Sequence, residues 1–189
     1  FEWPFLVEEF LPERLKLQLG QGPDGEVMDL DDALRLPLQG DYLYGAPASA
    51  TKAKAEVKLS RATMPFTQWQ EFTLGDVLLA EQAKEPEPLN ITLNEQGQGT
   101  FSLADELDGV RGLGPLEVAY RVSLAEPGGR AVNRSRTQYG WPAGSQWPAL
   151  RADFVAERVE GGKPLPFQIL NLDDQGQPVA GEVKVRLVN

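Results

Sequence analysis

The stretch that decides the fold is FLVEEFLPERLKLQL, residues 5–19, taken together with DYLYGAPA, residues 41–48. In the first stretch, a proline separates an apolar leading segment from leucines at alternate positions. In the second, two tyrosines at alternate positions close a strand-like segment, and a glycine and a proline stop it. Because successive side chains of a strand point to opposite faces, both stretches predict strands with one buried face.

The same period of two recurs along the chain. Apolar residues alternate with polar ones in four segments: 34–44, 53–59, 89–93 and 116–124. Such alternation is typical of antiparallel sheets, which bury one face and expose the other to water. The fold class that follows is all-β, built from antiparallel strands.

Turns rich in glycine and proline separate the strand-like segments. They supply the backbone freedom that tight turns require. Several short strands with such turns predict a β-sandwich. Residues 94–97 and 173–176 are similar amide or acidic turns, which we interpret as shared turn chemistry and not as a repeat. Two hairpins are expected: 89–94 with 100–103, and 115–126 with 130–139.

Residues 63–88 interrupt the alternation. They contain aromatic residues without a clean period, followed by a polar, proline-capped run at residues 81–88. We interpret them as a long excursion between strands, with one short helix near residues 74–82. Loops of this length are uncommon inside a compact domain. Decoration of the domain, or packing against a neighbour, is therefore favoured over a direct functional role.

A domain boundary is expected at residues 140–148, where two prolines and two glycines stop a strand. The first domain would span residues 1–142 and the second residues 148–189. Strand-like segments in the second are 151–155, 165–172 and 182–188. Because three strands leave open sheet edges and cannot close a sandwich, the second domain is predicted to be partial.

Composition excludes several classes of function. The 189 residues suit one large or two small domains, and the net charge is −10 with no histidine. An acidic surface disfavours nucleic acid and anionic membranes as partners. Without cysteine there is no disulfide, thiolate nucleophile or cysteine metal site. The chain starts with Phe1 and shows neither a leader nor a bilayer-length apolar run, so we interpret it as an internal piece of a longer protein.

No catalytic, cofactor-binding or metal-ligating residue is predicted. The usual histidine base is absent. Lys58 and Ser60 could suggest a serine–lysine pair, but their strand explains both. Residues 29–32 include three aspartates, yet they lack the glycine and glutamate spacing of a calcium loop, so a solvated acidic loop is favoured. Asp173 and Asp174 are interpreted as part of a turn.

Four tryptophans leave two interpretations open. Exposed aromatics on a sandwich could stack on sugar rings, as in a carbohydrate-binding module. However, Trp3, Trp141 and Trp147 lie beside prolines near the expected domain edges. Aromatic residues in such places more often fill a seam between domains. We favour the seam for these three and leave Trp69, in the excursion, unassigned.

The opening stretch and LYGAPA at residues 43–48 together resemble the start of a macroglobulin-like domain of the bacterial alpha-2-macroglobulins. Residues 93–101 resemble that family's later hairpin, and residues 126–143 resemble its exit towards the next module. Residues 176–183 are similar to a strand start within that next module. The resemblance implies one immunoglobulin- or fibronectin-like sandwich followed by part of a second.

The resemblance also implies a function. In this family such domains are structural and stack into a periplasmic shell that traps a protease after it cuts a bait segment. The chain would then be a non-enzymatic scaffold of a broad-range endopeptidase inhibitor. Its partners would be the neighbouring domains of the same chain, and proteases would be the targets of the whole protein. It would bind no cofactor or nucleic acid and would not insert into the membrane; a lipid anchor elsewhere is left open.

The family's thioester motif needs a cysteine, so that chemistry is not expected in this chain. Neither the bait segment nor the target proteases can be assigned. The alternative function is an extracellular carbohydrate-binding module, and a third is an adhesin or surface-assembly sandwich.

Overall fold

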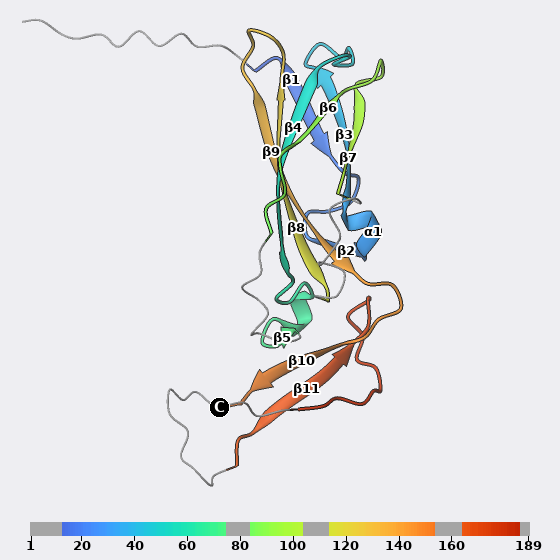
Figure 1. The fold of residues 1–189 in the computed structure, drawn as a ribbon, viewed down its shortest axis with the longest axis vertical. Coiled ribbons are helices and arrows are strands. Elements are labelled where there is room, and N and C mark those ends of the chain that lie inside the picture. Colours follow the sequence, from blue (N-terminus) through green and yellow to red (C-terminus); the bar gives the residue numbers. More distant parts are fainter. Residues whose placement is uncertain (1–12, 75–83, 104–113, 154–163, 186–189) are drawn as a thin grey trace, which may run out of the picture.

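The structure, a computed structural model, describes residues 13–74, 84–103, 114–153 and 164–185 (Figure 1). Almost every element is a strand. In chain order the elements are β1 (Leu15–Leu19), β2 (Glu26–Asp29), α1 (Leu30–Ala33), β3 (Arg35–Tyr42), β4 (Lys52–Arg61), the 3-10 turn η1 (Thr67–Trp69), β5 (Thr73–Leu74), β6 (Leu89–Thr92), β7 (Gln98–Ser102), β8 (Leu116–Ala125), β9 (Val132–Trp141), β10 (Trp147–Ala152) and β11 (Phe167–Leu172).

The first nine strands, β5 excepted, form a sandwich of two sheets. One sheet has the order β1-β3-β7 and the other the order β2-β9-β8-β4-β6. All pairings in them are antiparallel except β2 with β9, which is parallel. Figure 1 shows the two sheets face to face, with β10 and β11 below them. The predicted all-β sandwich of mainly antiparallel strands is therefore confirmed.

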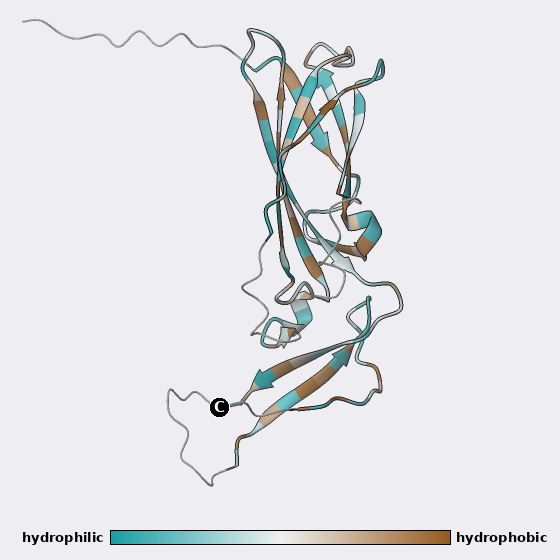
Figure 2. Ribbon diagram, viewed as in Figure 1, coloured by the Kyte–Doolittle hydropathy of each residue, from teal (hydrophilic) through white to brown (hydrophobic). Residues whose placement is uncertain are grey.

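The alternation in the sequence sets the core. Along β8, Leu116, Val118, Tyr120, Val122 and Leu124 are at most 1% exposed. They pack with the alternate residues of β4 and with leucines of β1 and β3 in one hydrophobic cluster. Figure 2 shows the resulting change between apolar and polar residues along the long strands. The strands predicted at 53–59 and 116–124 are confirmed.

Two predictions near β3 were wrong. The acidic residues expected as a solvated loop start a one-turn helix, α1, because the Asp29 side chain accepts a hydrogen bond from the Asp31 N–H (2.9 Å) and caps it. The strand expected over 34–44 stops at Tyr42, and Tyr44 is 78% exposed in the following turn. The rings of Tyr42 and Tyr44 stack with their centroids 5.1 Å apart, so they do share a face.

One of the two expected hairpins is present. β8 and β9 pair from Leu116–Gly140 to Leu124–Val132, as predicted. The hairpin between 89–94 and 100–103 was wrong, because β6 pairs with β4 whereas β7 pairs with β3 in the facing sheet. The turn between them docks on that sheet through a hydrogen bond from the Gly40 N–H to the Gly97 carbonyl (2.8 Å).

A third sheet, β11-β10-β5, follows the sandwich. Strands predicted at 151–155 and 165–172 correspond to β10 and β11, and β10 already starts at Trp147 in the expected linker. The third predicted strand, 182–188, was wrong for residues 182–185, which form no strand. Among the described residues none pairs with this stretch. Residues 186–188 of that prediction lie outside the described residues.

The helix expected near residues 74–82 falls almost wholly outside the described residues. Its one described residue, Leu74, belongs to β5. In the part of the chain that the structure describes, no helix has the length and apolarity needed to cross a membrane.

Candidate functional site

The side chains considered as catalytic or metal-binding candidates instead cap a helix, support a turn or lie on the surface of a strand. Asp29 caps α1, and Asp173 Oδ1 accepts hydrogen bonds from the backbone N–H groups of Gln175 (3.0 Å) and Gln177 (2.8 Å). Lys58 and Ser60 lie on the outer face of β4. Within the described ranges, no group of three or more acidic, histidine or cysteine side chains is placed to hold a metal ion.

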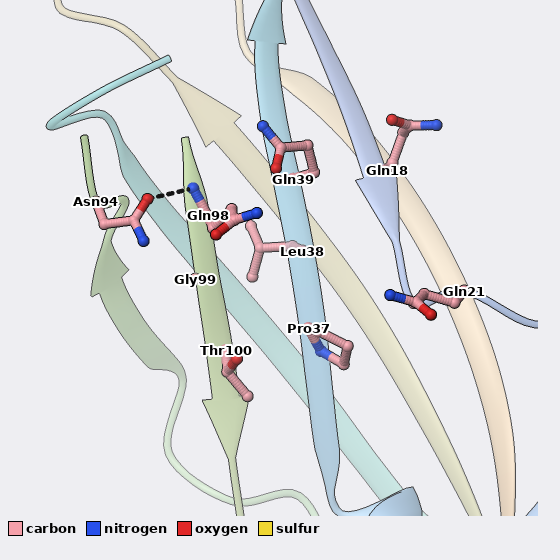
Figure 3. Close-up of a pocket in the computed structure, with 10 residues that line it drawn as sticks. Gln18, Gln21, Pro37, Leu38, Gln39, Asn94, Gln98, Gly99 and Thr100 are labelled. Carbon is pink, nitrogen blue, oxygen red and sulfur yellow. Dashed lines mark hydrogen bonds between the residues drawn. The ribbon is translucent and has the colours of Figure 1, made fainter. Parts of the chain in front are cut away.

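A trough of about 640 Å³ lies on the outer face of the β1-β3-β7 sheet (Figure 3). Its centre is a row of three amides, because Gln18, Gln39 and Gln98 are direct partners across the three strands. Asn94 adds a fourth amide, whose Oδ1 accepts from the Gln98 N–H at 2.8 Å. None of the lining residues is charged, so the trough offers no acid or base for catalysis.

The most developed site is the joint between the sandwich and the third sheet. We define its core as one buried cluster: Ala62, Met64, Phe66, Phe72, Leu74, Trp141, Ala149 and Leu172. These residues come from three places in the sequence, namely the segment from Ala62 to Leu74 after β4, the end of β9, and strands β10 and β11. Tight burial of apolar surface from both sides stabilises the two parts as one packed body.

The excursion contributes a strand to the third sheet. Thr73 and Leu74 pair antiparallel with Leu150 and Ala149 of β10. The sequence left decoration of the domain and packing against a neighbour open for the excursion, and its described residues 63–74 pack against the third sheet. The sandwich is thereby joined to the third sheet by backbone hydrogen bonding as well as by side-chain packing.

The turn after β11 is fastened to the excursion. The Trp69 indole N–H donates to the Gly176 carbonyl at 2.9 Å. Gly176 has φ +70° and lies so close to Phe66 that an added Cβ would stand 2.6 Å from its ring. Only glycine fits this position, because L-residues rarely adopt such a positive φ and any side chain would clash with the Phe66 ring.

The connection between β9 and β10 is also closed by tryptophans. Trp141 is 1% exposed and packs on Phe66 with ring centroids 5.4 Å apart. Its indole N–H donates to the Ser145 carbonyl (3.1 Å), and the Trp147 indole donates to Ser145 Oγ (2.9 Å). The seam predicted for Trp141 and Trp147 is confirmed, while Trp3 lies outside the described residues.

The rim of the joint carries a small charged group. Arg151 bonds Asp153 Oδ1 (3.0 Å) and Glu71 Oε2 (2.5 Å), and its guanidinium lies 5.2 Å from the centre of the Phe72 ring. The hydrogen bond to Asp153, followed by the one to Glu71, raises the pKa of Arg151. Because such pairs near the surface contribute little stability, the apolar core carries most of the joint's strength.

Sequence reasoning missed Met64, Phe66, Trp69, Phe72 and β5 as parts of the joint. Their signal was visible as a cluster of large apolar side chains inside a segment without strand periodicity. Such a cluster requires a partner surface, but its partners lie far along the chain, from Trp141 to Gly176. No local pattern identifies that surface.

Comparison with known proteins gives consistent results. Residues 13–142 match the family described as the bacterial alpha-2-macroglobulin MG5 domain. Alpha-2-macroglobulin of Escherichia coli strain K12 is 30% identical over an alignment 204 residues long. This alignment covers 98% of this chain and 12% of that protein. Alpha-2-macroglobulin of Xylella fastidiosa strain Temecula1 is 28% identical over 183 residues, covering 96% of this chain and 11% of that protein.

Solved structures show the same fold. The native conformation of E. coli alpha-2-macroglobulin matches with a TM-score of 0.69 and 29% identity over 92% of this chain. Its trypsin-activated form matches with a TM-score of 0.69 and 26% identity over 88%. In both cases the match covers 12% of the other chain. The present chain thus spans about a tenth of the length of the curated relatives that it matches.

Proposed function

The chain belongs to the bacterial alpha-2-macroglobulin family, and we propose that it is a structural module of a periplasmic protease trap. Its work is mechanical: it keeps adjoining modules in a fixed relation while the whole protein rearranges around a protease. The observation that carries the proposal is the joint, in which strand pairing, one indole hydrogen bond and a common apolar core unite two sheet systems.

The joint suits transmission of movement better than it suits a hinge. A hinge needs a few residues that absorb backbone change at low cost. Rotation of the third sheet here would separate β5 from β10 and expose Trp141 and Leu172, which are at most 1% exposed. Because closely packed interiors transmit strain, we expect the sandwich and the third sheet to move together as one body.

We propose that the chain has no catalytic activity of its own. Proteases would be partners of the whole protein, and the E. coli structures described as activated by trypsin and by porcine elastase support this assignment. We also propose a periplasmic location, on the strength of the family resemblance alone. Adhesion and carbohydrate binding have weaker support, because the Trp141 ring is buried in the joint and the rings of Trp69 and Trp147 pack against the same cluster.

We further propose two modules in this chain. The first is the sandwich, and the family match at 13–142 supports its boundary. The second spans 148–189, and its strand β10 pairs with β5, which belongs to the first module in sequence. The shared strand means that the modules are separate in sequence but not in packing.

The function can be tested with the complete gene product. It should suppress cleavage of a large protein substrate by trypsin while a small peptide substrate is still hydrolysed, as expected of a cage. Gly176→Ala, whose added Cβ would stand 2.6 Å from the Phe66 ring in the joint, should weaken this suppression, and Gly128→Ala should not, because nothing lies within 4 Å of its added Cβ.

The 189-residue chain alone should form no covalent adduct with trypsin on a denaturing gel and should hydrolyse neither substrate. An adduct or turnover by this chain would refute the proposal. Full suppression by the complete product with the joint demonstrably open would refute the mechanical role.

A further inference from the structure

The trough on the outer face of the β1-β3-β7 sheet has the size of a small-molecule site. Its volume of about 640 Å³ lies within the range of about 300–1,000 Å³ that is usual for such sites. A second hollow of about 540 Å³ adjoins it and shares the lining residues Gly20, Gln21, Pro37 and Thr100. The two hollows therefore form one elongated groove, which suits a chain-like ligand better than a single compact molecule.

Two side-chain amides of the trough are held in place by the protein itself. Gln39 Nε2 donates to the Gln96 carbonyl and to Asp41 Oδ1, both at 2.9 Å. Because an amide nitrogen has two hydrogens, Gln39 offers only its oxygen to a ligand, and in Figure 3 this oxygen points along β3 towards Pro37. Asn94 is fixed in the opposite sense: its Oδ1 accepts two backbone N–H groups, at 3.0 and 2.8 Å, so its Nδ2 remains as a donor.

The other amides of the trough are unbonded. Within the described ranges, the side chains of Gln18, Gln21 and Gln98 are exposed and make no hydrogen bond to the protein. An unbonded side-chain amide both donates and accepts. The trough thus combines a fixed acceptor, a fixed donor and adjustable groups of both kinds on adjacent strands, which lie about 4.8 Å apart. The matching ligand donates and accepts hydrogen bonds along its length.

Charge and shape narrow the chemistry of that ligand. No residue that lines the trough is charged, so neither an anion nor a cation finds a counter-charge there. Extended peptides bind by adding a strand to a sheet edge or by filling apolar pockets, whereas this trough lies on a sheet face and is lined mainly by polar side chains.

The floor of the trough has little relief, because Gly20, Pro37 and Thr100 lie side by side across the sheet. The flat sugar rings of an oligosaccharide fit such a floor, with their C–H groups on the Pro37 ring. Their hydroxyl groups both donate and accept hydrogen bonds, as the amides around the floor require. A neutral, hydroxyl-rich chain therefore matches the trough in charge, shape and hydrogen bonding.

We propose that this trough binds a neutral oligosaccharide through its side-chain amides. The hydrogen-bonding residues are Gln18, Gln39, Asn94 and Gln98. The two anchored amides fix the register of the sugar hydroxyls, and the unbonded ones adjust to them. The site uses none of the tryptophans that pack in the joint, and it lies on the sandwich, away from the third sheet (Figure 1). It is independent of protease trapping, so the two proposals can fail separately.

Nuclear magnetic resonance of the 189-residue chain tests the site directly, because each glutamine and asparagine side chain has its own NH₂ signals. The chain is titrated with three neutral trisaccharides: maltotriose, cellotriose and triacetylchitotriose. We expect at least one of them to shift the side-chain signals of Gln18, Asn94 and Gln98 in a saturable way while the tryptophan indole signals stay in place. No saturable shift with any of the three, or shifts confined to the indoles, would overturn the proposal.

Two variants of the trough test the roles of single amides. Gln98→Ala should weaken binding of that trisaccharide about fivefold, the effect of losing one net hydrogen bond. Gln18→Ala should do the same from the other side of the trough. Gln175→Ala removes an exposed amide outside the trough and should bind as the parent chain does. The backbone spectrum shows that each variant folds, and parental affinity in both trough variants would overturn the proposal.

The complete gene product shows whether the trough is open in the whole protein. Calorimetry should give it the same affinity for the trisaccharide as the 189-residue chain. Loss of binding in the complete product would overturn the proposal, because another module would then cover the trough. Shifts of the trough amides that depend on the concentration of the chain alone would also overturn it, since a second copy would then be the occupant.

Discussion

The Trp69 indole N–H donates to the Gly176 carbonyl at 2.9 Å, joining residues 107 positions apart. Trp69 belongs to the excursion of the sandwich, and Gly176 belongs to the turn that follows the third sheet. This hydrogen bond, together with the pairing of β5 with β10, connects the two proposed modules at the point where their apolar surfaces merge.

Replacing Trp69 with phenylalanine should lower the free energy of unfolding by about 1–2 kcal/mol. The variant removes the donor, a loss of about 1 kcal/mol, and trims part of the packed ring. Urea unfolding followed by circular dichroism measures the change. Tyr44→Phe is the control, because Tyr44 is 78% exposed and should leave stability within about 0.5 kcal/mol of the parent. No loss at Trp69 would mean that its bond does not hold the joint.

Gly176→Ala should destabilise the chain more than Gly128→Ala does. Both glycines have positive φ, +70° and +75°, so alanine costs about 1–2 kcal/mol of backbone strain at each. Only at Gly176 does the new Cβ meet an aromatic ring, at 2.6 Å from Phe66, which adds about 1–3 kcal/mol of overpacking. Thermal melts of the two variants compare the costs. Equal losses of stability in the two variants would show that the Phe66 ring moves away from the new Cβ at no cost.

Stability should fall above about pH 10 because of Tyr120. Burial raises the pKa of its phenol well above the ordinary value of 10.0, and the hydroxyl donates to the Ala33 carbonyl at 3.0 Å. The neutral form is kept in the folded state while the unfolded state loses its proton, so this contribution is complete below pH 10 and declines above it.

Tyr120→Phe should cost about 1 kcal/mol at neutral pH through the lost hydrogen bond and should flatten the alkaline decline. Tyr139, whose pKa is also raised by burial and then by Glu117, should leave a residual slope. Urea unfolding at a series of pH values from neutral upwards provides the measurement. An unchanged alkaline slope in the variant would contradict the assignment to Tyr120.

Leu74→Ala should cost about 2–5 kcal/mol, because Leu74 is 2% exposed in the joint core. Leu43→Ala is the matched control: the same substitution at a residue 66% exposed should cost less than about 0.5 kcal/mol. Guanidinium unfolding of both variants makes the comparison. Similar small losses would show that β5 is only loosely attached.

The sequence predicted the sandwich well where strands are long and half-buried. β4 and β8 alternate over ten residues each, so their inner faces could be assigned residue by residue. α1 and β5 were missed because neither is long enough to show a period, and each is held by distant partners. The helix is fixed by Tyr120 and by Gln138, whose side-chain amide donates to the Ala33 carbonyl at 3.0 Å, and β5 is fixed by β10.

The joint was only half predictable for a related reason. The prolines that follow Trp141 and Trp147 predicted a seam between domains, because tryptophan and proline occur together there at an expected domain boundary. Trp69 and Phe66 gave no indication of their partner, because contact with Gly176 depends on how the second module folds back. The strand expected at 182–188 was wrong over residues 182–185 for the opposite reason: the local pattern is sound, but no described strand lies beside these residues.

The central claim is that the sandwich and the third sheet form one cooperative body. Native-state hydrogen exchange of the 189-residue chain, with and without Leu74→Ala, tests it most directly. The account predicts that amides of β8 and of β10 open with similar free energies and that Leu74→Ala lowers both. If the β10 amides open at much lower free energy, and only they respond to the substitution, the joint is a flexible tether and the account is wrong.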